Sequence, residues 1–70
     1  MNKLVAELVK INGDVKCLVR IDSKGNALRL TTYKDEAQDE WTTTAHWRCS
    51  VDDVILFYQS TGYKITKLWN

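Results

Sequence analysis

Alternating apolar and polar positions run through the first third of the chain and predict paired β-strands. Asn12-Gly13 divides this region, and the dipeptide suits the two positive-φ positions of a type I′ hairpin turn. A two-residue loop there places Leu8 opposite Cys17 and Ala6 opposite Val19. Directly opposed residues share one face of a sheet, so this register predicts a single apolar face. Its members are Leu4, Ala6, Leu8, Val15, Cys17, Val19 and Ile21.

A second turn is predicted where polar residues surround Gly25. A loop of two or four residues at this turn adds Leu28 and Leu30 to the apolar face. A three-residue loop would instead place Arg29 opposite an apolar residue, and we reject it for that reason. Residues 3–33 are therefore predicted to form a three-stranded antiparallel meander.

The pattern near residue 50 predicts a helix. Ser50 is a typical N-cap, Asp52 and Asp53 follow in the first turn, and Gly62 lies where a helix-ending glycine is favoured. The apolar stripe of this helix would consist of Val51, Val54, Ile55 and Tyr58. The run of β-branched and aromatic residues from 54 to 58 also suits a strand, so the alternative stays open.

The remaining segments complete the predicted architecture. Residues 41–48 and 63–69 alternate as strands, and the acidic connector 34–40 is either a helical turn or a mobile loop. The order β-β-β-β-α-β predicts an α+β fold, in which one helix packs on one face of a small antiparallel sheet. We expect one domain spanning residues 1–70. If residues 51–61 are a strand, the alternative is an all-β, SH3-like small barrel.

Composition argues against several classes of function. The 70 residues carry a net charge of +1, and no apolar run is long enough to span a membrane. Glycine-rich phosphate-binding motifs are absent, and one histidine with two separated cysteines does not match the ligand spacing of zinc sites. We therefore expect a cytoplasmic protein that is not an enzyme, with no cofactor, metal ligand or catalytic residue. Cys17 and Cys49 are expected to be reduced and buried, Trp41 and Trp47 to fill the core, and His46 to be an exposed strand residue.

Charge is divided unevenly along the chain. The net charge is +3 over residues 1–32, −4 over residues 33–53 and +2 over residues 54–70. In the predicted register, Arg20 and Arg29 lie directly opposite each other on the face of the meander away from the core, where their repulsion is mildly destabilising. The candidate partner-binding residues on that face are Val9, Lys16, Leu18, Arg20 and Arg29.

Exposed aliphatic residues interleaved with arginine are typical of protein interfaces. The sequence therefore favours a protein-binding module, a regulator or inhibitor that acts by occupying the surface of another protein or that forms a homodimer through the same face. The alternative is a nucleic-acid-binding β-module. In that alternative, the phosphate contacts would come from Lys3, Lys16, Arg20 and Arg29. Phosphate binding weakens steeply with salt, whereas an apolar protein interface does not.

Overall fold

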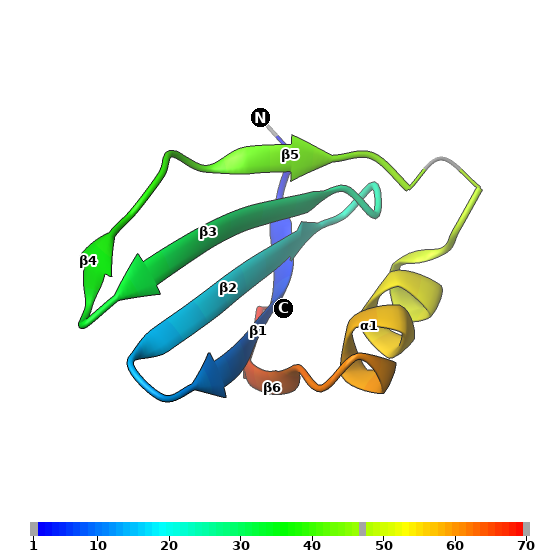
Figure 1. Cartoon of the computed structure of the whole chain (residues 1–70). Coiled ribbons are helices and arrows are strands. Elements are labelled where there is room, and N and C mark those ends of the chain that lie inside the picture. Colours follow the sequence, from blue (N-terminus) through cyan, green and yellow to red (C-terminus); the bar gives the residue numbers. More distant parts are fainter. Residues whose placement is uncertain (1, 47, 70) are drawn as a thin grey trace.

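The computed structural model describes residues 2–46 and 48–69, and in it six antiparallel strands form one sheet beside a helix (Figure 1). The elements are β1 (Leu4–Asn12), β2 (Val15–Asp22), β3 (Ala27–Tyr33), β4 (Glu36–Ala37), β5 (Thr42–Thr44), α1 (Val51–Ser60) and β6 (Lys64–Leu68). The strand order is β4-β3-β2-β1-β6, and β5 pairs separately with β3. The predicted α+β fold is confirmed, but the element order has one strand more than predicted, because the acidic connector, predicted as a helical turn or loop, contains the short strand β4, which pairs with β3.

The ends of α1 follow from local hydrogen bonding. The Ser50 hydroxyl accepts a hydrogen bond from the Asp53 backbone N–H at 3.2 Å, and the Asp53 carboxylate accepts one from the Ser50 N–H at 3.4 Å. This capping box satisfies two N–H groups that a helix start otherwise leaves without partners. Gly62 follows the C-terminal end with φ +103°, a conformation that L side chains rarely adopt. The prediction of a helix over this segment, with these ends, is confirmed.

The core lies between α1 and one face of the sheet, here called the inner sheet face. Val54 and Tyr58 of α1 are the buried helix residues, with Val51 and Ile55 packed beside them. The buried apolar residues are Ala6, Leu8, Val19, Ile21, Ala27, Val54 and Tyr58. The apolar stripe predicted for the helix is thus the stripe that covers the sheet.

The first hairpin turns one residue later than predicted. Asn12 pairs with Val15, so the two loop residues are Gly13 and Asp14. Only Gly13 has a positive φ, +63°, as in a type II′ turn. The predicted type I′ turn is therefore wrong, and the strand pairing moves by two positions. Because side chains alternate with a period of two, this shift leaves the same residues on the inner sheet face.

A bulge in β1 changes the side to which its first residues point. The pairing with β2 shifts between Leu4 and Ala6. Val5 packs against the core, whereas Leu4 lines a hollow on the opposite face with Arg20. The prediction that Leu4 belongs to the inner sheet face is wrong, because a bulge inserts one residue that the alternation does not reveal.

The second hairpin adopts the register that the sequence argument rejects. Val19 pairs with Arg29, and Ile21 pairs with Ala27. A three-residue loop therefore connects β2 and β3, and its last residue, Gly25, has φ +82°. The shift of one residue turns Leu28 and Leu30 to the face away from α1, where they were not predicted.

Asp22 holds this loop together from within. Its carboxylate accepts hydrogen bonds from the backbone N–H groups of Lys24 at 2.9 Å and Asn26 at 3.0 Å. The side-chain amides of Asn2 and Asn26 donate two more at 3.2 Å. Burial opposes ionisation, but these hydrogen bonds outweigh it and hold the pKa of Asp22 below its ordinary value. The loop is thus built around a buried, ionised side chain.

The turn between β3 and β4 lacks glycine although its backbone favours it. Tyr33 pairs with Glu36, so Lys34 and Asp35 form a two-residue loop. Their φ angles are +50° and +67°, the pattern of the type I′ turn that was predicted elsewhere. Residues with a Cβ atom are strained in this conformation.

The position of the first turn can be tested with two substitutions. Gly13→Ala places a Cβ at positive φ and should lower the free energy of unfolding by about 1 kcal/mol, although nothing lies within 4 Å of that Cβ. Asn12→Thr should change it by less than about 0.5 kcal/mol, because Asn12 is an ordinary strand residue. Urea denaturation measures both. A large decrease in the free energy of unfolding of the Asn12→Thr variant would instead support the predicted type I′ turn at residues 12 and 13.

The strained turn after β3 offers a stabilising change. Replacing Lys34→Asn together with Asp35→Gly should raise the free energy of unfolding by about 1 kcal/mol, since this pair favours a type I′ turn. Asp35 also forms an exposed ion pair with Lys16 at 3.3 Å, which the double variant loses. The Lys16→Ala variant measures how much the loss of this ion pair alone lowers the free energy of unfolding. A double variant less stable than the Lys16→Ala variant would contradict the assigned turn.

Candidate functional site

The face of the sheet away from α1, here called the outer sheet face, carries the candidate binding surface. Cross-strand pairing places Val9 beside Leu18 and Leu18 beside Leu30, in a row across β1, β2 and β3. The next row places Arg20 beside Leu28. The surface consists of Val9, Lys16, Leu18, Arg20, Leu28, Leu30 and Trp41. The apolar strand residues among them are only partly buried, because the helix packs on the other side.

Four of the five residues proposed from the sequence lie on this face, and Arg29 does not. Arg29 pairs with the fully buried Val19 and therefore points to the inner sheet face. Burial raises the pKa of Tyr58 and Tyr63, and the positive charge of Arg29 on this face opposes that rise. The predicted opposition of Arg20 and Arg29 is wrong, because the one-residue shift of β3 places the two side chains on opposite faces.

Trp41 was predicted in the core but lies on the outer sheet face. Its ring is 4.7 Å from the guanidinium carbon of Arg20, and the residue is 39% exposed. A guanidinium stacked on an indole ring is held by cation–π attraction and by contact. The alternation in residues 41–48 could not reveal this position, because the segment forms only the three-residue strand β5 on the edge of β3. Trp47 lies outside the described residues.

The acidic connector borders this surface and is hydrogen-bonded to β3. Asp35 pairs with Lys16, and the Asp39 carboxylate accepts a hydrogen bond from the Thr31 N–H at 3.2 Å. Gln38 donates its N–H to the Thr31 carbonyl at 3.0 Å. The connector therefore follows β3 closely, and one of the outer-face cations already has an acidic neighbour.

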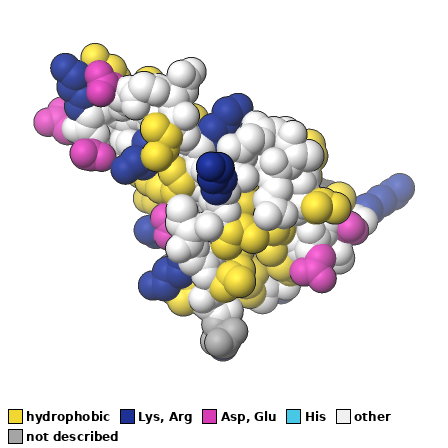
Figure 2. Space-filling view, turned by 90° about the horizontal axis from the view of Figure 1, so that it is seen from below, with side chains coloured by type: hydrophobic (Ala, Val, Ile, Leu, Met, Phe, Trp, Pro, Cys, Tyr) yellow, Lys and Arg dark blue, Asp and Glu magenta, His cyan; other side chains and the backbone are white. Residues whose placement is uncertain are grey.

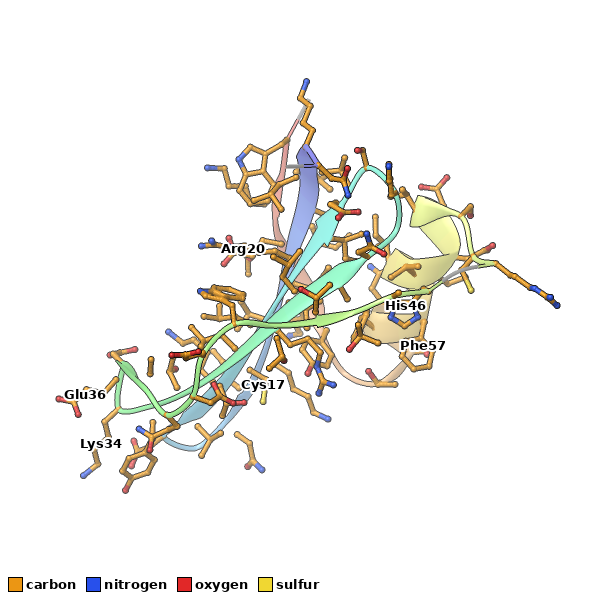
Figure 3. All side chains as sticks on the ribbon, turned by 90° about the horizontal axis from the view of Figure 1, so that it is seen from above. Cys17, Arg20, Lys34, Glu36, His46 and Phe57 are labelled. Carbon is orange, nitrogen blue, oxygen red and sulfur yellow. The ribbon has the colours of Figure 1, made fainter. Side chains whose placement is uncertain are left out.

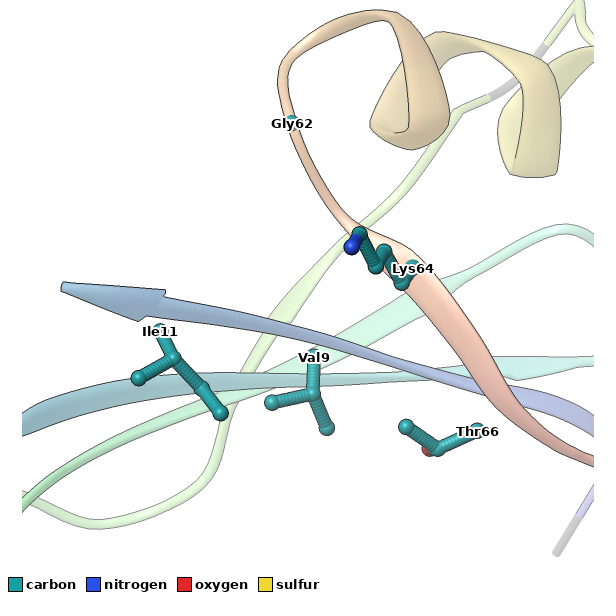
Figure 4. A pocket seen from close by; sticks show the side chains of 5 residues that line it. All are labelled: Val9, Ile11, Gly62, Lys64 and Thr66. Atoms are coloured by element: carbon teal, nitrogen blue, oxygen red, sulfur yellow. The ribbon is translucent and has the colours of Figure 1, made fainter.

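Two hollows lie on the outer sheet face, toward opposite ends of β1. One has a volume of about 260 Å³ and is lined by Val9, Ile11 and Thr66, with Lys64 and Gly62 at its border (Figure 4). The other, of about 340 Å³, lies between Leu4, Leu28 and Trp41, with Arg20 beside them. Both combine apolar walls with one basic side chain, and the lining of the second also includes Asn2 and the acidic Asp22.

Aromatic side chains form a second cluster on the inner side. The His46 Nε2 lies 3.3 Å from the Tyr58 hydroxyl, and the Tyr58 ring contacts the rings of Phe57 and Tyr63 edge to face. Figure 3 shows His46 and Phe57 together beside the helix, apart from Arg20. His46 was predicted as an exposed strand residue, but it is half-buried in the connection before α1. This cluster attaches that connection to the helix.

Burial in this cluster raises the pKa of Tyr58, opposed by the charge of Arg29. It also raises the pKa of Tyr63, where Cys17 adds to the effect and Arg29 opposes it. Both rings thus keep their uncharged form more firmly in the folded protein than in the unfolded chain.

Further apolar side chains are exposed near β6 and α1. Figure 2 views the molecule from that side and shows hydrophobic side chains gathered in the middle of the face, with lysine or arginine side chains beside them. Leu56 is 63% exposed on the helix, and Leu68 is 63% exposed on the edge strand β6. Substitutions in this second apolar region can therefore serve as controls for substitutions on the outer sheet face.

The cysteines differ in their surroundings, and neither forms a disulfide. Cys17 is half-buried, whereas Cys49 is exposed, so the prediction that both are buried is wrong for Cys49. Within residues 2–46 and 48–69, no three His, Cys, Asp or Glu side chains gather in a group that could hold a metal ion. No helix in the described part of the chain has the length and apolar character to cross a membrane.

Comparison of the chain with protein-family models, with curated proteins and with solved structures finds no match. A function must therefore be inferred from the surface itself. The outer sheet face is the stronger candidate because it brings a row of aliphatic side chains, a stacked arginine and two hollows onto one side of the sheet.

The tyrosine cluster predicts instability at high pH. Unfolded tyrosine has a pKa of about 10, and both rings titrate above their ordinary value when folded. The free energy of unfolding should therefore be unaffected by them below about pH 10 and fall as the pH rises through the folded-state values. Urea titrations between about pH 8 and pH 11.5 measure the decline.

Tyr63→Phe is the matched control for this decline, because it keeps the ring stacking and removes the ionisable hydroxyl. Its stability should depend less steeply on pH than that of the unmodified chain above about pH 10. Identical slopes for the two proteins would show that Tyr63 ionises equally well in the folded and unfolded states.

Proposed function

We propose that this chain is a small protein-binding module that acts by occupying the surface of another protein, as a regulator or inhibitor does, through its outer sheet face. The observation that carries the proposal is the row formed by Val9, Leu18 and Leu30, which lies on the face that the helix does not cover. Burial of such partly exposed aliphatic groups is the main driving force of protein association. A second copy of the chain is one partner that this face suits.

Residues near the aliphatic row have the character of interface hot spots. Arginine and tryptophan are enriched among residues that dominate binding energy, and Arg20 with Trp41 supplies both beside Leu28. Their stacking orders two large side chains before a partner arrives, which reduces the entropy lost on binding. The proposal assigns no catalytic role to any residue.

Nucleic-acid binding has less support from the geometry. Of the four predicted phosphate contacts, Arg29 lies on the inner sheet face and Lys16 pairs with Asp35. Arg20 stacks on Trp41, so this pair leaves less of the ring open to a nucleic-acid base. The arrangement thus separates the basic residues that a phosphate-binding surface would gather together.

Leu18→Gln tests the proposed surface, and Leu56→Gln is its matched control. Both remove an aliphatic side chain, but Leu56 lies on the exposed side of α1. We expect Leu18→Gln to reduce capture of the partner from host lysate, or to split a homodimer in sedimentation, by at least about tenfold in affinity. Leu56→Gln should bind as the unmodified chain does. Amide NMR spectra confirm that each variant is folded.

Nuclease treatment and added salt during the capture distinguish a protein partner from a nucleic-acid partner. Binding through the outer sheet face should survive nuclease treatment and weaken little when salt is raised. Loss of binding on nuclease treatment, or loss in the Leu56→Gln variant with Leu18→Gln unaffected, would contradict the proposal.

A further inference from the structure

The hollow around Arg20 has the features of a ligand site. It has a volume of about 340 Å³ and opens on the outer sheet face near the start of β1. Its lining consists of Asn2, Leu4, Arg20, Asp22, Leu28 and Trp41. The bulge in β1 is what turns Leu4 into this hollow, and the register of β3 is what brings Leu28 there.

Arg20 lies in the hollow without an ion-pair partner among the described residues. The guanidinium carbon lies 4.7 Å from the centre of the Trp41 ring, and the Nε atom is enclosed without a hydrogen-bond acceptor. Glu7 is the cross-strand neighbour of Arg20, yet among the described residues no carboxylate forms an ion pair with the guanidinium. The enclosed Nε is closed to a ligand, so an acceptor would have to bind the Nη groups of the guanidinium, for which the described residues provide no hydrogen bond either.

The carboxylate in the lining, that of Asp22, already accepts hydrogen bonds from other groups. Asp22 accepts four hydrogen bonds, from Asn2, Lys24 and two groups of Asn26, and is not within ion-pair distance of Arg20. Its charge is therefore compensated by amide groups of its own turn and of Asn2. Arg20 is therefore the charged group of the lining whose side chain has no ion-pair or hydrogen-bond partner among the described residues, and it could bind an anion.

We propose that this hollow binds a carboxylate carried by an acidic residue of the partner protein, next to an aliphatic residue of the same segment. This inference rests on the proposed protein-binding function and specifies the chemistry of the partner. The two oxygens of a carboxylate match the planar donor edge of a guanidinium, and Leu4 and Leu28 provide apolar walls for the aliphatic neighbour. A phosphate suits the hollow less well, because the lining has no second cation beside Arg20 to balance its second negative charge.

NMR titration of the unmodified chain with short peptides tests this site. The probe is acetyl-Leu-Glu-amide, its uncharged analogue is acetyl-Leu-Gln-amide, and inorganic phosphate and acetate are further probes. We expect the Leu-Glu peptide to shift the Arg20 Nε–H and Trp41 indole N–H signals saturably, and to bind at least about fivefold more tightly than the analogue. Equal affinity for the two peptides, or tighter binding of phosphate than of the Leu-Glu peptide, would overturn the proposal. Acetate that binds as tightly as the peptide would overturn the role of the aliphatic neighbour.

Variants on the two faces of the sheet provide the controls. Arg20→Gln should lose the preference for the acidic peptide, and Arg20→Lys should keep part of it, because lysine retains the charge without the planar donor edge. Arg29→Gln removes the same charge from the inner sheet face and should leave peptide binding unchanged. Loss of the preference in Arg29→Gln, or its retention in folded Arg20→Gln, would contradict the site.

The outcome separates this inference from the proposed function. If Leu18→Gln abolishes partner capture but the acidic peptide shows no preference for Arg20, the outer sheet face is the interface and the carboxylate site is wrong. If the peptide binds at Arg20 but Leu18→Gln leaves partner capture intact, the proposed interface is wrong.

Discussion

The buried carboxylate of Asp22 fixes the three-residue loop between β2 and β3, and the identity of both sheet faces depends on that loop. Its four hydrogen bonds make a loop of this length favourable, with Gly25 at positive φ. A loop one residue longer or shorter would turn Leu28 and Leu30 toward the helix and bring Arg29 to the other side. The apolar outer sheet face therefore follows from the chemistry of one turn.

Features determined by neighbours in the sequence could be predicted. The ends of α1 follow from Ser50 and Gly62, because caps act over three or four residues. The residues predicted for the inner sheet face of β1 and β2 are correct from Ala6 onward, although the turn was predicted one residue too early. An error of two positions in the strand pairing preserves the alternation of the side chains. Local chemistry and periodicity are enough for these elements.

Features determined by distant contacts could not be predicted from the pattern. The side to which β3 points depends on hydrogen bonds to Asp22 that include one from Asn2. Trp41 looks like a core residue by composition, but its position is set by stacking on Arg20 from a different strand. Of the candidate site, the sequence therefore predicts Val9, Lys16, Leu18 and Arg20 as one face, misplaces Arg29 and misses Leu28, Leu30 and Trp41.

The pairing of β1 with β6 has a consequence for how the chain reaches its folded state. The Thr66 hydroxyl donates to the Glu7 carbonyl across 59 positions of sequence, and β6 completes the hydrogen bonds along one edge of β1. Closing so long a loop is slow relative to forming the two hairpins, which join neighbouring strands. Wherever β6 is detached, that edge of β1 has unpaired N–H and C=O groups, and such an open edge favours pairing with another chain. The pairing of β6 with β1 therefore also protects the meander against association through this edge.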